Sequence, residues 1–433
     1  MPGPLRIGLA GLGTVGGGVA QLLDLHGARL AERCGRPIVL AGVSARDRAK
    51  AASLPLGGAE WHDDCIDLAR RRDIDVVVEL IGGADGPARA LVQTALANGK
   101  HVVTANKALL AHHGVALARL ADEKNVALNF EASVAGGIPI VKALREGLAG
   151  NRIGRLYGIL NGTSNYILTA MAKSGRAFAD VLAEAQALGY AEADPSFDVD
   201  GVDAAHKLSL LASVAFGTEV DFGAVHVEGI RHVAAADIAY ARELGFRIKL
   251  LGLARLTPHG VEARVHPCLV PAEAAIAHVD GVYNAVVAEG DFVDQQMFQG
   301  RGAGAGPTAS AVVADLIDIA HGLRLSPFGV PTAALARLPA SPMAKRAGRY
   351  YLRLQVLDRP GVIADIAAIL RDENVSIESL LQHGRAPGEG VPVAIVTHEA
   401  EEAAIGRTLA RLGGIEAVVE PPVLIRIESF AAA

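Results

Sequence analysis

The chain has 433 residues, a formal net charge of −6 and a pI near 6.2, which argues against nucleic acid or an anionic membrane as the main partner. Hydrophobic residues make up 51% of it and aromatic residues only 4%, so we expect two or three domains with aliphatic cores. The N-terminus lacks a signal-peptide pattern, and no apolar run of about 18 residues could span a bilayer. Three widely spaced cysteines (Cys34, Cys65, Cys268) indicate free thiols and a cytoplasmic location. The adjacent pair His112-His113 cannot share one helix face, which argues against a transition-metal site.

The first motif follows an apolar strand at Arg6–Ala10. Three glycines there make the pattern G-x-G-x-x-G, and an apolar helix is predicted from Val15 to Leu30. Such glycines permit a tight turn, a close backbone approach to a pyrophosphate and close packing of helix on strand. The alternative is a merely tight strand-helix turn. The motif predicts a dinucleotide site that includes Gly11, Gly13, Thr14, Val15 and Gly16.

The second predicted strand, Pro37–Val43, bears on the choice of cofactor. An NAD site usually has an acid at the end of this strand to bind the ribose 2′-hydroxyl. Here the strand ends in Ser44-Ala45-Arg46, with Arg48 close behind. A guanidinium suits a 2′-phosphate, so NADP(H) is favoured over NAD(H), with Arg46 as its ligand. The alternative is a solvated basic turn.

Strands and helices alternate up to about residue 130, which is typical of a parallel, doubly wound sheet. Ligands of such sheets bind beyond the carboxyl ends of the strands, where we expect Gly82-Gly83, Thr104 and Lys107 to lie. Within this alternation the second strand spans Ile38–Val43. The further predicted strands are Val76–Leu80, His101–Thr104 and Ala127–Phe130, and the predicted helices include Ala88–Asn98 and Leu109–Lys124.

The stretch Glu131–Val141 links this region to a second set of strands, from Arg155–Leu160 through Ala263–Leu269. A glycine-rich loop at Gly300–Gly306 precedes a helix predicted at Ala309–Gly322. The loop is either a flexible linker or a close approach to a cofactor. Residues Ala333–Arg349 carry prolines and basic side chains, which indicates another linker.

An acid-rich stretch, Gly189–Lys207, precedes an apolar helix. Asp203 and Lys207 lie four residues apart, so they share one helix face. Taken alone, such a pair is most often a solvated salt bridge. Together with the dinucleotide motif, the concentration of charge favours a functional site. The acids of the stretch are Glu192, Asp194, Asp198, Asp200 and Asp203.

Residues Tyr350–Glu428 read as a separate unit of about 75–80 residues with the order βαββαβ. The alternating segment YLRLQVLD precedes the turn Asp358-Arg359-Pro360-Gly361. An amphipathic helix, two strands, a second helix and a last strand, VLIRIE, complete the order.

With these pieces assembled, the chain resembles homoserine dehydrogenase with a C-terminal ACT domain, in its monofunctional form. The resemblance covers almost the whole sequence. Its motifs are GLGTVG, VVTANKALLA, FEASVAGGIPI, GILNGTSNYIL, LGYAEADPSFDVDGVDAAHK and GAGAGPTASAVVADL, of which the acid-rich stretch ending in Lys207 is the most specific.

The resemblance implies NAD(P)-dependent interconversion of L-homoserine and L-aspartate 4-semialdehyde in threonine, methionine and isoleucine biosynthesis. It makes Lys207 the general acid/base, Asp203 its neighbour and a ligand of the substrate amino group, and Lys107 the residue where nicotinamide and substrate meet. Position 206 is His where the family has a basic residue. The further implied residues are Glu192, Asp198, Tyr190 and Thr163 for substrate, Gly189, Gly302 and Gly304 for cofactor, and Glu131 with the carbonyls of Val134, Gly136 and Ile138 for Na+. For this last set the alternative is a simple glycine hinge.

We therefore expect an α/β protein with a Rossmann domain (1–133, with helix 307–322 packing back on it), an α+β catalytic and dimerisation domain (134–335) and an ACT domain (349–430). The last should bind L-threonine as an allosteric effector, or only dimerise, and the chain should form a dimer or tetramer. Two rival functions are aldehyde oxidation through a thioester, which needs an activated cysteine, and a cofactor-bound amino-acid sensor.

Overall fold

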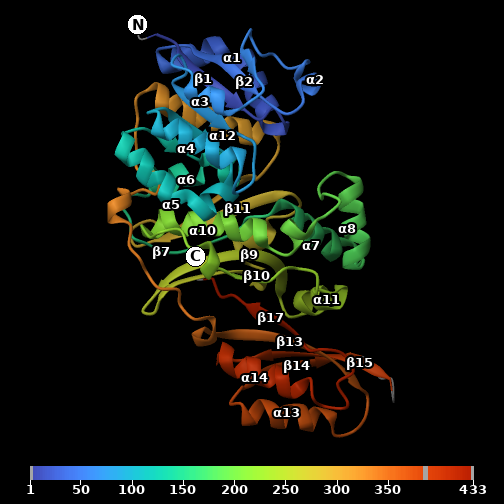
Figure 1. The fold of residues 1–433 in the computed structure, drawn as a ribbon. Helices are drawn as coiled ribbons and strands as arrows, with labels where there is room; N and C mark the ends of the chain where they lie inside the picture. The colour runs from blue at the N-terminus through green and yellow to red at the C-terminus, as the bar shows by residue number, and fades with distance from the viewer. Residues whose placement is uncertain (1–2, 384–388, 431–433) are drawn as a thin grey trace.

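The structure is a computed structural model that describes residues 3–383 and 389–430 (Figure 1). An N-terminal sheet with its helices, a central mixed sheet and a C-terminal βαββαβ unit follow one another down the molecule. Within the described part of the chain, no helix is long and apolar enough to cross a membrane. Residues 1–2 of the expected first domain and 384–388 of the expected last one lie outside the described residues, and the domain boundaries stay predictions.

The N-terminal layer is a parallel, doubly wound sheet, as the sequence predicts. Its strands are β1 (Leu5–Ala10), β2 (Ile38–Ser44), β3 (Glu60–His62), β4 (Val76–Glu79), β5 (His101–Thr104) and β6 (Leu128–Asn129). They lie in the order β3-β2-β1-β4-β5-β6, and their helices include α1 (Thr14–Cys34), α2 (Arg48–Ala51), α3 (Ile66–Arg70), α4 (Pro87–Ala97) and α5 (Lys107–Lys124). The sequence missed β3, because three residues are too few to display an alternating pattern.

A helix from late in the chain completes this layer. Helix α12 (Ala305–Ala320) packs against α1, so orange and blue ribbons lie together in Figure 1. Its side chains Val312 and Leu316 join the core formed by Leu9 and Val19. The helix begins earlier than the sequence predicts, because a proline is tolerated within the first helical turn.

The central layer is a mixed sheet, and most of its helices lie on its upper side in Figure 1. Its strands are β7 (Ile153–Ile159), β8 (His226–Val227), β9 (Phe246–Thr257), β10 (Gly260–Pro271), β11 (Tyr283–Gly290) and β12 (Asp294–Arg301). The helices are α7 (Gly162–Ser174), α8 (Phe178–Ala187), α9 (Ser196–Val199), α10 (Val202–Phe216) and α11 (Ala235–Glu243). Helix α10 contacts β9 and β10 on one side and α5 on the other, so its N-terminus lies where the two layers meet.

The C-terminal unit has the predicted order of elements. It comprises β13 (Ala347–Leu357), α13 (Val362–Asp372), β14 (Ile377–Gln382), β15 (Gly390–Thr397), β16 (Ala400–Glu401), α14 (Glu402–Leu412) and β17 (Val423–Ile427). The strands pair antiparallel in the order β17-β13-β15-β14, and both helices lie on the lower side of the sheet in Figure 1.

This unit is not separate, which corrects the expectation from the sequence. Strand β17 pairs with β13 on one side and runs parallel to β10 on the other, so the central and C-terminal sheets are continuous. The predicted linker Ala333–Arg349 is also anchored, with β-bridges from Ala336 to Thr218 and from Ala340 to Val261. The two layers are therefore joined through main-chain hydrogen bonds.

Candidate active site

A buried carboxylate, Asp203, lies at the centre of the site, in the first turn of α10. The Nζ of Lys207 is 2.6 Å from one of its oxygens, and the Nζ of Lys107 is 3.2 Å from the other. Burial opposes the charged form, but the two ammonium groups outweigh burial and lower the pKa of Asp203 to about 2. Asp203 is therefore ionised at neutral pH and holds both lysines together.

Asn161 links this group to a second carboxylate. Its Nδ2 donates to Asp203 at 2.8 Å and to Asp198 at 2.7 Å, while its Oδ1 caps α7 by accepting from the Ser164 N–H. Burial, followed by the charge of Asp203, raises the pKa of Asp198. Sequence reasoning missed Asn161, because Asn before a helix indicates only an N-cap.

A cavity of about 560 Å3 surrounds these groups. Thr163 lies on its wall and donates to the carbonyl of Tyr190 at 2.7 Å. Glu192 is exposed and does not line the cavity, so the structure does not bring this predicted residue to the site. The predicted residues that do line it are Val15, Lys107, Gly136, Thr163, Gly189, Tyr190, Asp198, Asp203, Lys207, Gly302 and Gly304.

Two residues beside the cavity differ from their sequence-based interpretation. Thr104 is fully buried and donates to the carboxylate of Glu79 at 2.6 Å. Its hydroxyl therefore holds Glu79 and does not line the cavity. Glu79 also accepts from the N–H groups of Ile81 and Gly82, a buried acid that the sequence did not single out. Burial and the neighbouring His112 lower the pKa of His206 to about 4, so position 206 carries no charge at neutral pH.

A second cavity, of about 690 Å3, lies over the glycine motif and is lined by Gly11, Gly13 and Arg46. A Cβ at Gly16 would lie 1.9 Å from the carbonyl oxygen of Gly11, so this turn admits only glycine. A Cβ at Gly13 would meet open space, where a pyrophosphate can approach the N-terminus of α1. The geometry therefore fits a dinucleotide.

The rim of this second cavity shows where the 2′ position of the ribose could be bound. Arg46 is exposed there, whereas Arg48 lies over the Trp61 ring at 5.4 Å. Acids line the cavity too, but Asp63 accepts from the Trp61 indole and Asp64 from a main-chain N–H. Asp47 lines the cavity beside Arg46, and Arg46 is the cation among the lining residues.

Cys65 lines the second cavity, so the thioester alternative, which needs an activated cysteine, can be judged on this thiol. Burial, and the neighbouring charge of Asp64, raise the pKa of its thiol. A thiol with a raised pKa is a poor nucleophile, and Cys65 does not line the cavity around Lys207. The thioester alternative therefore loses its support.

Glu131 is buried, and its two oxygens accept from the main-chain N–H groups of Val141 and Lys142 at 2.9 and 2.7 Å. Burial raises the pKa of this carboxyl to about 7. The adjacent turn has two successive residues with positive φ, Ala135 at 53° and Gly136 at 33°. A nearby cation favours the charged carboxylate, and Lys142 and Arg145 already supply positive charge to it. A buried carboxyl beside such a turn is compatible with the expected Na+ ligand set.

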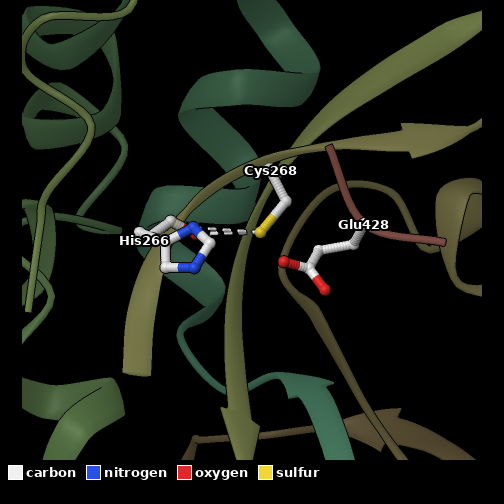
Figure 2. Close-up of side chains that lie close together, drawn as sticks. All are labelled: His266, Cys268 and Glu428. Carbon is white, nitrogen blue, oxygen red and sulfur yellow. Dashed lines mark hydrogen bonds between the residues drawn. The ribbon is translucent and has the colours of Figure 1, made fainter. Parts of the chain in front are cut away.

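Figure 2 shows a cluster that the sequence analysis did not identify: His266, Cys268 and Glu428, whose possible ligand atoms all lie within 4.8 Å of one another. The carboxylate of Glu428 accepts from Arg264 at 2.9 Å and from Arg346 at 2.8 Å. Burial and the surrounding arginines hold the pKa of His266 well below its usual range. The same positive charges oppose a metal cation at this cluster.

Comparisons with known proteins agree with this geometry. Residues 11–131 match the NAD-binding domain of homoserine dehydrogenase, residues 139–317 match the homoserine dehydrogenase family itself, and residues 350–414 match the ACT domain. A homoserine dehydrogenase of Neisseria gonorrhoeae is 48% identical over 99% of both chains. The chain belongs to the homoserine dehydrogenase family.

Solved structures support the same assignment. A homoserine dehydrogenase from Thiobacillus denitrificans superposes with a TM-score of 0.93 at 47% identity, over 98% of each chain. A hyperthermophilic archaeal homoserine dehydrogenase in complex with NADPH has a TM-score of 0.63 at 26% identity, over 74% of this chain and 98% of that one. The predicted family, fold class and activity as an NAD(P)-dependent homoserine dehydrogenase are thereby confirmed.

Proposed function

We propose that Lys207 is the proton donor when this enzyme reduces L-aspartate 4-semialdehyde to L-homoserine. The observation that carries the proposal is the set of contacts around its ammonium group. Nζ donates to Asp203 at 2.6 Å and to the carbonyl of Leu160 at 2.7 Å. An ammonium has three donors, so one N–H remains for a substrate oxygen in the cavity that Lys207 lines.

When bound, the nicotinamide supplies the hydride to the aldehyde carbon. Lys207 gives its proton to the oxygen as negative charge develops there, and takes it back in the reverse direction. Lys107 adds a second positive charge on the other side of Asp203, which stabilises the developing alkoxide. The substrate ammonium would be bound by Asp198 and Asp203, because a cation relieves the repulsion between these two carboxylates. A role for Glu192 in substrate binding stays a prediction. The Lys207 variant described in the Discussion tests the proposal.

The cofactor is proposed to be NADPH, with Arg46 as the ligand of the 2′-phosphate. We expect Arg46→Ala to weaken NADPH binding about tenfold or more and to leave NADH binding unchanged, because one charge-assisted hydrogen bond is lost. Fluorescence titration with both cofactors measures this selectivity. Arg48→Ala is the matched control, because that guanidinium is already over Trp61. Equal losses for NADPH and NADH in the Arg46 variant would show that Arg46 does not contact the phosphate.

We also propose that Glu131, with the carbonyls of Val134, Gly136 and Ile138, binds Na+. The support is the buried carboxyl with its raised pKa and the strained turn beside it. Sodium chloride should then raise Tm more than choline chloride at equal ionic strength, because Na+ binds the folded state only. Glu131→Gln should remove the difference between the two salts. The same Tm in both salts for the unsubstituted chain would contradict the proposal.

L-Threonine is the proposed effector of the ACT domain, and a dimer or tetramer the proposed assembly. Gly361, with φ of 97° at the N-terminus of α13, presents main-chain N–H groups that suit an amino-acid carboxylate. Strands β12 and β14 stand at the two ends of the continuous sheet, where a second copy could pair. The cytoplasmic location stays a prediction.

Millimolar L-threonine should inhibit the full-length enzyme, and Gly361→Val should abolish inhibition while kcat is retained, because a Cβ strains this turn far from Lys207. D-Threonine is the matched control ligand. A truncation after Ala340 is a poorer test, because it would remove β17 and uncover β10. Unchanged inhibition of the Gly361 variant would contradict the site.

A further inference from the structure

The acid-rich loop of the active site is held from behind by another segment, residues 228–231. The N–H of Ile230 donates to the carbonyl of Val199 at 2.8 Å, one residue after Asp198. A Cβ at Gly229 would lie 2.3 Å from that same carbonyl oxygen, so the two backbones are in direct contact. A shift of this segment therefore moves the loop that carries Asp198.

A surface contact fastens the same two segments a second time. The guanidinium of Arg231 donates to the carboxylate of Asp200 and, at 3.0 Å, to the hydroxyl of Ser196. Asp200 precedes Gly201, the N-cap of α10, and so adjoins the helical turn that carries Asp203. The segment thus contacts the loop on both sides of Asp198, and it reaches the residue that precedes the N-cap of α10.

Glu228, at the start of the segment, is bound to the C-terminal unit. Its carboxylate accepts from Arg426 of β17 in a bidentate pair, with distances of 2.7 and 2.9 Å. Its main-chain N–H donates to the carbonyl of Val265 in β10. Arg426 is buried and also donates to Glu402 on α14, so it connects the segment to both a strand and a helix of the ACT domain.

We propose that Glu228 is a positioning residue, through which Arg426 sets the place of Asp198 and Asp203 in the substrate site. Bidentate pairs fix direction as well as distance, so a movement of β17 is passed to the 228–231 segment and from there to the loop. This positioning affects substrate affinity even when no effector is bound. A role of the same contacts in feedback inhibition rests on the proposed threonine site.

Glu228→Gln, Arg426→Gln and the double variant test the positioning role. We expect the KM for homoserine to rise about five- to tenfold in each single variant, within the usual range of site-to-site coupling. The kcat and the KM for NADPH should stay close to those of the unsubstituted enzyme, because neither residue lines a cavity of the site. The loss in the double variant should be smaller than the product of the two single losses, because both substitutions break the same contact between Glu228 and Arg426. Each substitution also breaks a contact of its own, with His226 or with Glu402.

Arg407→Gln is the matched control, since it removes an exposed arginine of α14 that pairs only with Glu373 among the described contacts. An unchanged homoserine KM in both single variants, or effects that multiply in the double variant, would overturn the proposal. If Glu228→Gln does not fold, the surface variant Arg231→Ala provides a second test of the same contact between the segment and the loop. Its homoserine KM should also rise, and an unchanged value would overturn the proposal equally.

Measurements of threonine inhibition separate the positioning role of Glu228 from its role in transmitting the effect of threonine. Calorimetry on the full-length chain should show that Glu228→Gln still binds L-threonine, while threonine no longer raises its homoserine KM. Inhibition equal to that of the unsubstituted enzyme would overturn the role of Glu228 in transmission. If the unsubstituted enzyme itself is not inhibited, the threonine proposal fails, and the KM values alone decide the positioning role.

Discussion

Lys207→Ala should lower kcat about 10²- to 10⁴-fold, the usual contribution of a positioned general acid. The expected loss is large because the ammonium of Lys207 has one donor left for the substrate after its bonds to Asp203 and Leu160. NADPH affinity should be unchanged, since Lys207 is absent from the cavity over the glycine motif. Steady-state kinetics in both directions and a cofactor titration measure the two quantities.

Two further lysines make this experiment decisive. Lys107 also contacts Asp203, at 3.2 Å, so Lys107→Ala asks which ammonium transfers the proton. We expect the smaller loss of kcat for Lys107, because it would stabilise charge without giving up a proton. Lys173→Ala, at an exposed position, is the control and should leave kcat unchanged. Activity near that of the unsubstituted enzyme in Lys207→Ala would remove Lys207 from the mechanism.

The parts of the fold that the sequence predicts are those fixed by local chemistry. The turn between β1 and α1 needs glycine at Gly16 whatever the rest of the chain does, because the Gly11 carbonyl leaves no room for a Cβ. Asp203 and Lys207 meet because they lie four residues apart on one helix. In both cases the two residues in contact are close together in the sequence, so their spacing alone indicates the contact.

The parts that the sequence does not predict depend on partners distant in the chain. The continuous sheet rests on only two residue pairs between β10 and β17, Cys268 with Arg426 and Leu269 with Ile427. Asn161 bridges Asp198 and Asp203 only because α9, which carries Asp198, contacts both α7 and α10 in the fold. Glu192 is assigned to the substrate by the resemblance, but its side chain is exposed and does not line the cavity, so its role stays a prediction.

Asp203→Asn should damage both stability and activity. Removing one partner of a buried ion pair costs up to about 3–5 kcal/mol, because the remaining charge is left unpaired. Here Lys207 keeps only its bond to the Leu160 carbonyl, and Lys107 loses its counter-charge. The kcat should fall by about 10²-fold, because Lys207 is no longer aimed at the substrate oxygen. Chemical unfolding and steady-state kinetics at pH 7 measure both effects.

The pH dependence of stability distinguishes this charge effect from a simple packing fault. The pKa of Asp203 in the folded state, about 2, lies below that of an aspartate in an unfolded chain. Its stabilising contribution is therefore complete above pH 4, and it is lost as the pH falls through the folded-state pKa. The free energy of unfolding should differ most between Asp203→Asn and the unsubstituted enzyme at pH 5–8, and the difference should shrink below pH 4. Asp194→Asn, at an exposed acid of the same loop that accepts from the Ser196 N–H, is the control and should lower stability at pH 7 far less. Suppose instead that the difference in free energy of unfolding between the two proteins stays constant down to the lowest pH at which both fold. In that case the lost stability comes from packing, and the charge of Asp203 does not hold the two lysines.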